Sequence, residues 1–285
     1  MKRTQKSSLL RRDFEKFVDN KMAVLGLFLV VILVVLAVLA PLFTSFDPTF
    51  VDPANRLQPP SREHLLGTDR VGRDLWARLL YGGRISIFVA LSGIVSAHLI
   101  GVTLGCISGY FGGKTDAVIV FISEIFMAFP SGILIFIMVG FLGQGLGNLI
   151  FVFAITNWPG ILRIVRSRIL SLKEEAFVEN CRVCGVSNFA IMFRHLLPNT
   201  LGPVIVSITL GTGGLVLAEA GLSFLGLGVP SGIPTWGNII NAANSLQAIQ
   251  QYPLLWIAPG VMISVFVLGV NFLGDGLRDV LDATM

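Results

Sequence analysis

Three side chains in one polar stretch of the sequence are of types that bind metals or exchange electrons. Cys181 and Cys184 form a Cys-x-x-Cys pair, and His195 follows eleven residues later. A structural zinc site uses four ligands, and only three candidates are present, so we expect no metal. A thioredoxin-like redox pair needs a βαβ pattern around it, which this stretch lacks. Cys106 is the third and last cysteine, which excludes a disulfide scaffold.

Nucleotide-binding and catalytic patterns are missing from the sequence. The phosphate-binding pattern GxxxxGK[ST] does not occur, and the stretch Gly143-Gln-Gly-Leu-Gly147 has no lysine. Neither HExxH nor a Ser/His/Asp order nor a pair of catalytic carboxylates stands out. We therefore expect no enzyme activity and no cofactor in this chain, so any energy source must be a separate protein.

Three ionisable side chains fall within or near apolar stretches. Burying a charge in hydrocarbon is costly, so Glu124 should face protein or a water-filled path. Glu219 lies near one end of an apolar stretch, where a solvated boundary position is the main alternative to a place on such a path. For His98, hydrogen-bonded packing is the main alternative to a proton relay. All three are candidate pathway residues.

The composition fits a membrane protein. Apolar residue types make up 54% of the 285 residues, and charged types only 13%. Soluble domains carry about 25% charged residues, so a soluble globular enzyme and a disordered chain are both excluded. The net charge of +4 is concentrated in a few loops. That distribution indicates membrane orientation rather than nucleic-acid binding.

Six apolar segments are long enough to cross a bilayer, which takes about 20 residues. They span residues 22–43, 85–109, 117–142, 149–165, 201–225 and 254–273. Pro130 and Pro259 are expected to interrupt the third and the sixth. The first segment is too long for a cleaved signal peptide and is interpreted as an uncleaved helix. The sequence therefore predicts an all-α integral membrane protein with six transmembrane helices.

Basic residues predict the orientation of these helices. With the N-terminus inside, fifteen of the 21 Lys and Arg residues fall in inner segments and six in one outer loop. The excess places both termini in the cytoplasm. In the outer loop, the pattern from Asp74 to Tyr81 predicts a short helix lying on the membrane surface, with Trp76 at the headgroup boundary.

Small residues recur every fourth position along the second segment, at Gly93, Ala97, Gly101, Gly105 and Gly109. This spacing puts them on one helical face, where another helix can approach closely. Packing within the chain is the simpler interpretation, and a subunit or gate interface is the alternative.

The inner loop at about 166–199 predicts two short helices. Ser171 and Glu174 form a capping box that should start a helix running to Cys184. Gly185 should stop that helix, Ser187 should cap a second one, and Pro198 should end it. Such a rigid element suits docking to a cytoplasmic partner, with a purely structural loop as the alternative.

Several motifs resemble those of one transporter family. Glu179 to Gly185, followed by His195-Leu-Leu-Pro-Asn199, resembles the EAA motif of ABC importer permeases. Asn180 and Cys181 stand in place of the two alanines. Further motifs in the same order resemble the C-type permease of the dipeptide/oligopeptide/nickel branch: Leu66-Gly-Thr-Asp69, Gly72-Arg-Asp74, Gly83-Arg-Ile-Ser86, Gly109-Tyr-Phe-Gly-Gly113, Asp116, Leu222-Ser-Phe-Leu-Gly-Leu-Gly228, Thr235-Trp-Gly237 and the stretch from Asn271 to Asp279.

The resemblance implies a MetI-like permease fold. Residues 1–84 would hold the N-terminal segment, the first transmembrane helix and the outer loop, and residues 85–285 the permease core. The residues implied to couple to ATPases lie in the EAA loop: Glu175, Glu179, Arg182, Gly185, Arg194, His195, Leu197 and Pro198.

The resemblance also implies partners in a bacterial or archaeal cytoplasmic membrane. These are a homologous permease, two ATP-binding subunits that carry ATP and Mg²⁺, and an extracytoplasmic substrate-binding protein. Peptides are the first choice of cargo, with nickel or another metal chelate as the alternative. A self-sufficient secondary transporter or channel is the rival class, and it would need no ATPase.

Overall fold

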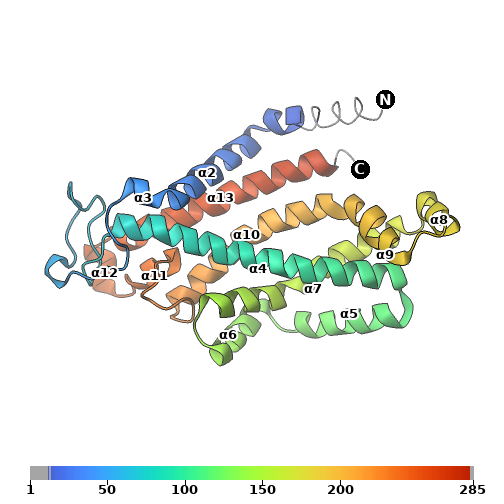
Figure 1. Cartoon of the computed structure of the whole chain (residues 1–285). Coiled ribbons are helices and arrows are strands. Elements are labelled where there is room, and N and C mark those ends of the chain that lie inside the picture. The colour runs from blue at the N-terminus through green and yellow to red at the C-terminus, as the bar shows by residue number, and fades with distance from the viewer. Residues whose placement is uncertain (1–11, 13, 283–285) are drawn as a thin grey trace.

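The computed structural model describes residues 12 and 14–282, and these form an elongated bundle of helices (Figure 1). Within these residues there is no β-strand, and the one β-bridge joins Thr68 to Asp74. The predicted all-α class is confirmed for this part of the chain.

Five stretches are long and apolar enough to cross a membrane, or six if one broken pair counts as a span. The long helices are α2 (Lys21–Val38), α4 (Leu75–Phe111), α7 (Leu146–Leu172), α10 (Leu201–Phe224) and α13 (Leu254–Asp282). The broken pair is α5 (Gly113–Met127) and α6 (Ser131–Leu142), whose axes differ by 85°. The predicted interruption at Pro130 is the site of this bend, whereas α13 continues through Pro259.

Shorter elements lie toward the two ends of the bundle (Figure 1). They are α3 (Ala40–Phe43), η1 (Pro53–Asn55), α8 (Ala176–Val183), α9 (Asn188–Ala190), η2 (Ile191–Leu196), η3 (Leu197–Thr200), α11 (Trp236–Asn241) and α12 (Leu246–Gln251). We call the end with α8 and α9 the α8 end, and the end with α11 and α12 the α11 end. α2 begins and α13 ends toward the α8 end.

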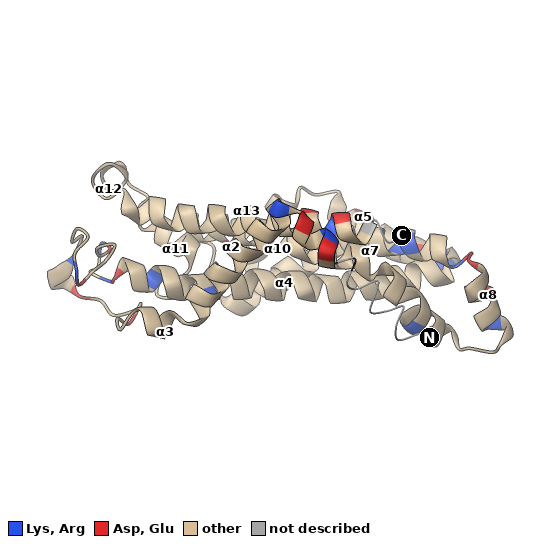
Figure 2. Ribbon diagram, turned by 90° about the horizontal axis from the view of Figure 1, so that it is seen from above, with Lys and Arg blue, Asp and Glu red and all other residues tan. Residues whose placement is uncertain are grey.

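The glycine ladder of α4 lies against α7. A Cβ atom on Gly101 would come within 2.7 Å of the Trp158 carbonyl oxygen, and one on Gly109 within 2.8 Å of Ile169 Cβ. The small residues therefore allow the backbones of α4 and α7 to approach closely, and both helices are apolar where they meet. Figure 2 shows the uncharged character of α4 and α13, which have no Lys, Arg, Asp or Glu over long stretches.

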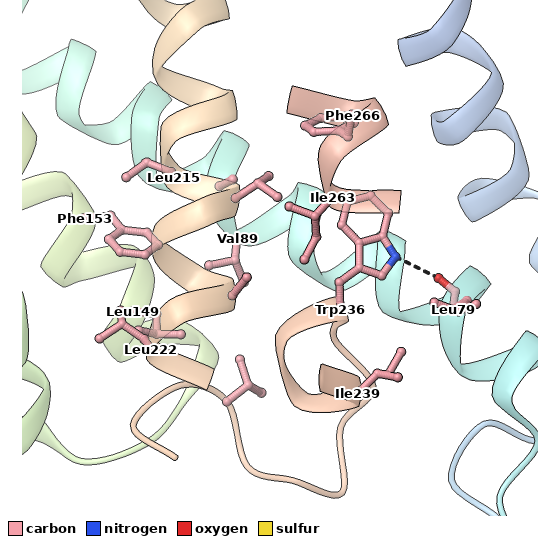
Figure 3. Close-up of a cluster of buried hydrophobic side chains, with 14 of the residues drawn as sticks. Leu79, Val89, Leu149, Phe153, Leu215, Leu222, Trp236, Ile239, Ile263 and Phe266 are labelled. Atoms are coloured by element: carbon pink, nitrogen blue, oxygen red, sulfur yellow. Dashed lines mark hydrogen bonds between the residues drawn. The ribbon is translucent and has the colours of Figure 1, made fainter. Parts of the chain in front are cut away.

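The main apolar core lies toward the α11 end, around the fully buried side chain of Trp236. Its ring packs edge-on to Phe266 with centroids 5.9 Å apart, and its Nε1 donates to the Leu79 carbonyl oxygen at 3.0 Å (Figure 3). α11 thus turns back into the bundle and is fixed between α4 and α13.

The expected surface helix at Asp74–Tyr81 is instead the first two turns of α4. Asp74 caps α4 by accepting from Ala77 N at 2.7 Å. Leu75, Leu79 and Leu80 are at most 2% exposed. The prediction was wrong because these residues pack against their own bundle, which the short periodic pattern cannot distinguish from packing against lipid.

The loop after α7 differs from the prediction at two points. α7 continues to Leu172, so Ser171 lies in its last turn and α8 begins only at Ala176. Beyond Ser187, the chain is helical from α9 through η2 and η3 into α10, so Pro198 ends no helix. Pro198 lies in the first turn of η3, where its missing N–H removes no intrahelical hydrogen bond.

Candidate functional site

The turn between α8 and α9 is built as the sequence predicts. Gly185 has φ +71°, its N–H donates to the Arg182 carbonyl oxygen, and Val186 N donates to the Cys181 carbonyl oxygen, both at 3.0 Å. This pair of bonds is the Schellman motif, which ends a helix on a left-handed residue. Ser187 Oγ then accepts from Ala190 N and caps α9. The two helices are therefore joined by a defined turn rather than by a flexible linker.

The other face of this helix pair is anchored in a second apolar cluster. Val178, Ile191 and Leu196 are fully buried and pack with Val165 and Ile169 of α7. The packing in this cluster holds the helix pair in place against the bundle. The opposite face is exposed, including Val183 at 83% and Phe189 at 69%.

Most of the residues proposed for coupling lie on the exposed face of this element. The exposed ones are Glu175, Glu179, Arg182, Gly185, Arg194 and Pro198, whereas His195 and Leu197 are half-buried. Within the described residues, the three acidic and basic side chains of α8 and its cap form no salt bridge. The charges of Glu175 and Glu179 are thus available to another protein, whereas Arg182 also lies over the Tyr110 ring.

The three cysteine thiols are all free. Cys106 is buried inside α4, Cys181 is half-buried in α8 and Cys184 is exposed at its end. The latter two therefore lie on the accessible helix pair. In the part of the chain that the structure describes, no group of three His, Cys, Asp or Glu side chains could hold a metal ion.

Glu219 is fully buried, which excludes the solvated boundary position that was one of the two interpretations. Its Oε2 accepts from Ser86 Oγ at 2.9 Å and its Oε1 from Ser223 Oγ at 2.7 Å. Ser86 Oγ accepts in turn from Trp236 N at 3.1 Å. The carboxylate thus joins α4, α10 and α11 inside this chain. The apolar sequence around Glu219 shows where the residue lies along the helix. It does not show that the side chain faces the other helices of this chain.

His98 also lies between helices of this chain. Its Nδ1 is 2.8 Å from the Ile94 carbonyl oxygen and its Nε2 2.6 Å from Ser207 Oγ of α10. Both ring nitrogens are thereby satisfied, and the side chain is 4% exposed. This geometry is that of a packing residue, which was the simpler of the two interpretations.

Glu124 differs from the other two ionisable residues because it is exposed. It lies on α5, one turn before the bend at Ala128 to Pro130, and Phe121 on the same helix is 63% exposed. The structure therefore does not bring Glu124, Glu219 and His98 together. Only Glu124 is on a surface that a path or a second subunit could share.

An ion pair at the α8 end was not predicted. Arg166 of α7 donates from Nε and Nη2 to the two carboxylate oxygens of Asp116, both at 2.6 Å. Ser108 of α4 donates to the same carboxylate. Three helices are joined at this point. The motif that includes Asp116 was visible in the sequence, but its partner fifty residues later was not.

The loop between α3 and α4 is held by a second set of charges. Asp69 accepts from Arg73 Nε at 2.7 Å and from the backbone N–H groups of Val71 and Arg73. Arg78, 1% exposed, donates to the Pro48 carbonyl oxygen at 3.0 Å. A Cβ atom on Gly72 would lie 1.8 Å from the Asp52 carbonyl oxygen, so the glycine in this motif is required by the close approach of two backbones.

Two acids in the same loop, the exposed Asp47 and the half-buried Asp52, are stabilised in their charged form. Donation from the Thr49 hydroxyl and then the Thr49 N–H lowers the pKa of Asp47. Donation from the Asn55 side chain and then from Ala54 N lowers the pKa of Asp52. These local turns give the loop a defined shape at neutral pH.

Comparison with known proteins places these features in a family. Residues 101–285 match the family described as binding-protein-dependent transport system inner membrane component. Residues 8–60 match the N-terminal TM domain of oligopeptide transport permease C.

Curated relatives agree over nearly the whole chain. The dipeptide transport system permease protein DppC of Alkalihalophilus pseudofirmus is 43% identical over 275 residues, which are 96% of this chain and 90% of the relative. The oligopeptide transport system permease protein OppC of Bacillus subtilis is 38% identical with the same coverage. A putative peptide permease of Brucella suis is also 38% identical, over 273 residues. The chain therefore belongs to the family of binding-protein-dependent inner-membrane permeases of ABC importers, and within it to the C-type permeases of the dipeptide and oligopeptide branch.

Proposed function

We propose that this chain is one of two homologous permease subunits of an ATP-driven peptide importer, in which it forms half of the translocation pathway. The cargo proposal is supported by relatives that are named as dipeptide and oligopeptide permeases and that align with 96% of the chain. Glu124 is exposed near the α5–α6 bend and forms no salt bridge within the described residues, so it suits a wall of that pathway. Glu219 and His98 take part through the packing of the chain instead.

The observation that carries the proposal is the exposed helix pair α8 and α9. It has a defined turn at Gly185, a buried apolar cluster around Val178 and an outer face whose charged side chains form no salt bridge within the described residues. We infer that two ATP-binding subunits dock on this pair and on its counterpart in the second permease. Because α9 continues through η2 and η3 into α10, a displacement of α9 would be passed directly to a membrane helix.

The other partners follow from the same assembly. The α8 end and both termini would face the cytoplasm of a bacterial or archaeal cell, with six crossings of its membrane. ATP and Mg²⁺ would bind to the ATP-binding subunits and not to this chain. A substrate-binding protein would deliver peptides to the α11 end, where the ordered loop 44–74 lies.

Reconstitution of the complete complex tests this function. The purified complex in lipid nanodiscs, supplied with its binding protein, should hydrolyse ATP faster when dipeptides or short oligopeptides are added. The same complex in sealed vesicles should accumulate peptide only when ATP is present. Stimulation by nickel chelates but not by peptides would show that the cargo is a metal chelate and not a peptide. Uptake by this chain without any ATP-binding subunit would show that it is a channel or a secondary transporter and not part of an ATP-driven importer.

A further inference from the structure

Tyr110, the penultimate residue of α4, contacts both helices of the exposed pair. Its hydroxyl donates to Asn188 Oδ1, on the first residue of α9, at 2.7 Å. The guanidinium carbon of Arg182 on α8 lies 5.7 Å from the centre of the Tyr110 ring. A cation at this distance from an aromatic face is attracted to it. One side chain of α4 thus reaches both α8 and α9.

Tyr110 also belongs to the second apolar cluster, which packs beneath the helix pair. It is 9% exposed and packs in the cluster that contains Ile169, Val178 and Ile191. Among the helices, α8 packs chiefly against η2, and it has no extended contact with α4 or α7. α8 is therefore connected to the long helices through a few side-chain contacts, which include those of Val178 and Tyr110.

The helix that carries Tyr110 extends to the opposite end of the molecule. α4 has 37 residues, or roughly 55 Å at 1.5 Å per residue. Near its other end, Ser86 binds Glu219 and the backbone of Trp236. Between these points its glycine ladder is locked against α7. α4 is therefore a stiff element with defined contacts at both ends.

We propose that Tyr110 is a positioning residue through which movement of α8 and α9 is passed to α4. The inference rests on the proposed function, because the movement is that of the ATP-binding subunits docked on this pair. The hydroxyl fixes α9 and the ring face holds α8 through Arg182, so both helices move with the end of α4. The direct route from α9 into α10 moves one membrane helix, and Tyr110 adds a second.

The phenylalanine variant separates the hydrogen bond from the packing. Tyr110→Phe keeps the ring, its buried contacts and the Arg182 interaction, but removes the donor to Asn188. Because the Asn188 side chain is exposed, it can bind water instead, so the fold and the docking of ATPases should be kept. Because one hydrogen bond between α4 and α9 is lost, we expect the number of peptides imported per ATP hydrolysed to fall about two- to tenfold.

Variants of the acceptor and a matched tyrosine serve as controls. Asn188→Leu removes the acceptor and should match Tyr110→Phe, and the double variant should be no worse than either. Asn188→Asp keeps an acceptor oxygen and should retain the normal ratio. Tyr81→Phe changes a tyrosine of the same helix whose hydroxyl makes no hydrogen bond in the described part of the chain, and it should have no effect.

The measurements are ATPase pull-down, peptide-stimulated hydrolysis and uptake by the full complex in sealed vesicles. The proposal predicts normal pull-down with a reduced ratio of uptake to hydrolysis. An unchanged ratio in Tyr110→Phe, or equal losses in Asn188→Asp and Asn188→Leu, would overturn it. If the unmodified complex binds no ATPase or imports no peptide, the proposed function fails instead, and the two failures are thereby distinguished.

Discussion

Ser86 Oγ of α4 donates a hydrogen bond of 2.9 Å to Glu219 Oε2 of α10, across 133 positions of sequence. Both residues are 0% exposed, and Ser223, at 1%, donates to the other carboxylate oxygen. A carboxylate so deep in a bundle is expensive unless its oxygens are hydrogen-bonded. Its position here joins two membrane helices and, through Trp236 N, the re-entering helix α11.

Removing the Glu219 carboxylate should therefore destabilise the bundle. Glu219→Ala leaves the Ser86 and Ser223 hydroxyls without their acceptor and opens a cavity. Each unsatisfied buried group costs about 1–3 kcal/mol. We expect a lower thermal midpoint of the purified protein for Glu219→Ala and a smaller decrease for Glu219→Gln, which keeps one acceptor oxygen. Glu63→Ala, at an exposed acid, is the control and should match the unmodified protein. An unchanged midpoint in Glu219→Ala would show that the network contributes nothing.

A β-branched residue at Gly185 should weaken coupling without preventing insertion. No atom lies within 4 Å of the position of an added Cβ, so the cost is in the backbone, which has φ +71°. A left-handed conformation costs roughly 1–2 kcal/mol for a residue with a Cβ. Gly185→Val should reduce both ATPase pull-down and peptide-stimulated hydrolysis at normal membrane levels of the chain.

Asparagine at position 185 provides the matched comparison, because Asn tolerates the left-handed region. Gly185→Asn should lose less of both activities than Gly185→Val. Should both variants behave like the unmodified chain, the α8–α9 turn is not the coupling element.

Neutralising Glu124 should change transport but not assembly. The side chain is exposed on α5 and forms no hydrogen bond or salt bridge within the described residues, so no packing depends on its charge. We expect Glu124→Gln to reach normal membrane levels and to show a several-fold change in peptide uptake. Uptake and binding-protein-stimulated hydrolysis are measured beside Glu63→Gln, an exposed acid of the α3–α4 loop. Identical uptake in all three proteins would argue against a pathway role.

Labelling with a membrane-impermeant thiol reagent tests the orientation. The native Cys184 is exposed at the α8 end, and Thr49→Cys places a thiol in the exposed loop near the α11 end. With Cys106 and Cys181 changed to alanine, intact cells should be labelled at position 49 only, and permeabilised cells at both. Labelling of Cys184 in intact cells would reverse the assignment of the two ends.

The sequence by itself determined the features that depend on local chemistry. The length of the apolar segments predicted where the long helices lie. A helix satisfies its backbone hydrogen bonds within one segment, and the apolar side chains of that segment make it suitable for a membrane. The glycine spacing on α4 predicted a close helix contact, and Gly185 and Ser187 predicted the turn and the cap between α8 and α9. Each of these features depends on residues within a single stretch of the chain.

Only the tertiary structure decided which partners these segments have. Glu219 is buried because Ser86 and Ser223 supply its donors, and the apolar sequence around it carries no sign of that arrangement. The turns after Asp74 belong to α4 because other helices of the bundle cover them, and Tyr110 joins α8 and α9 to α4 through residues more than seventy positions later. Contacts between distant residues depend on how whole helices pack, and periodicity within one segment does not encode the identity of its neighbour.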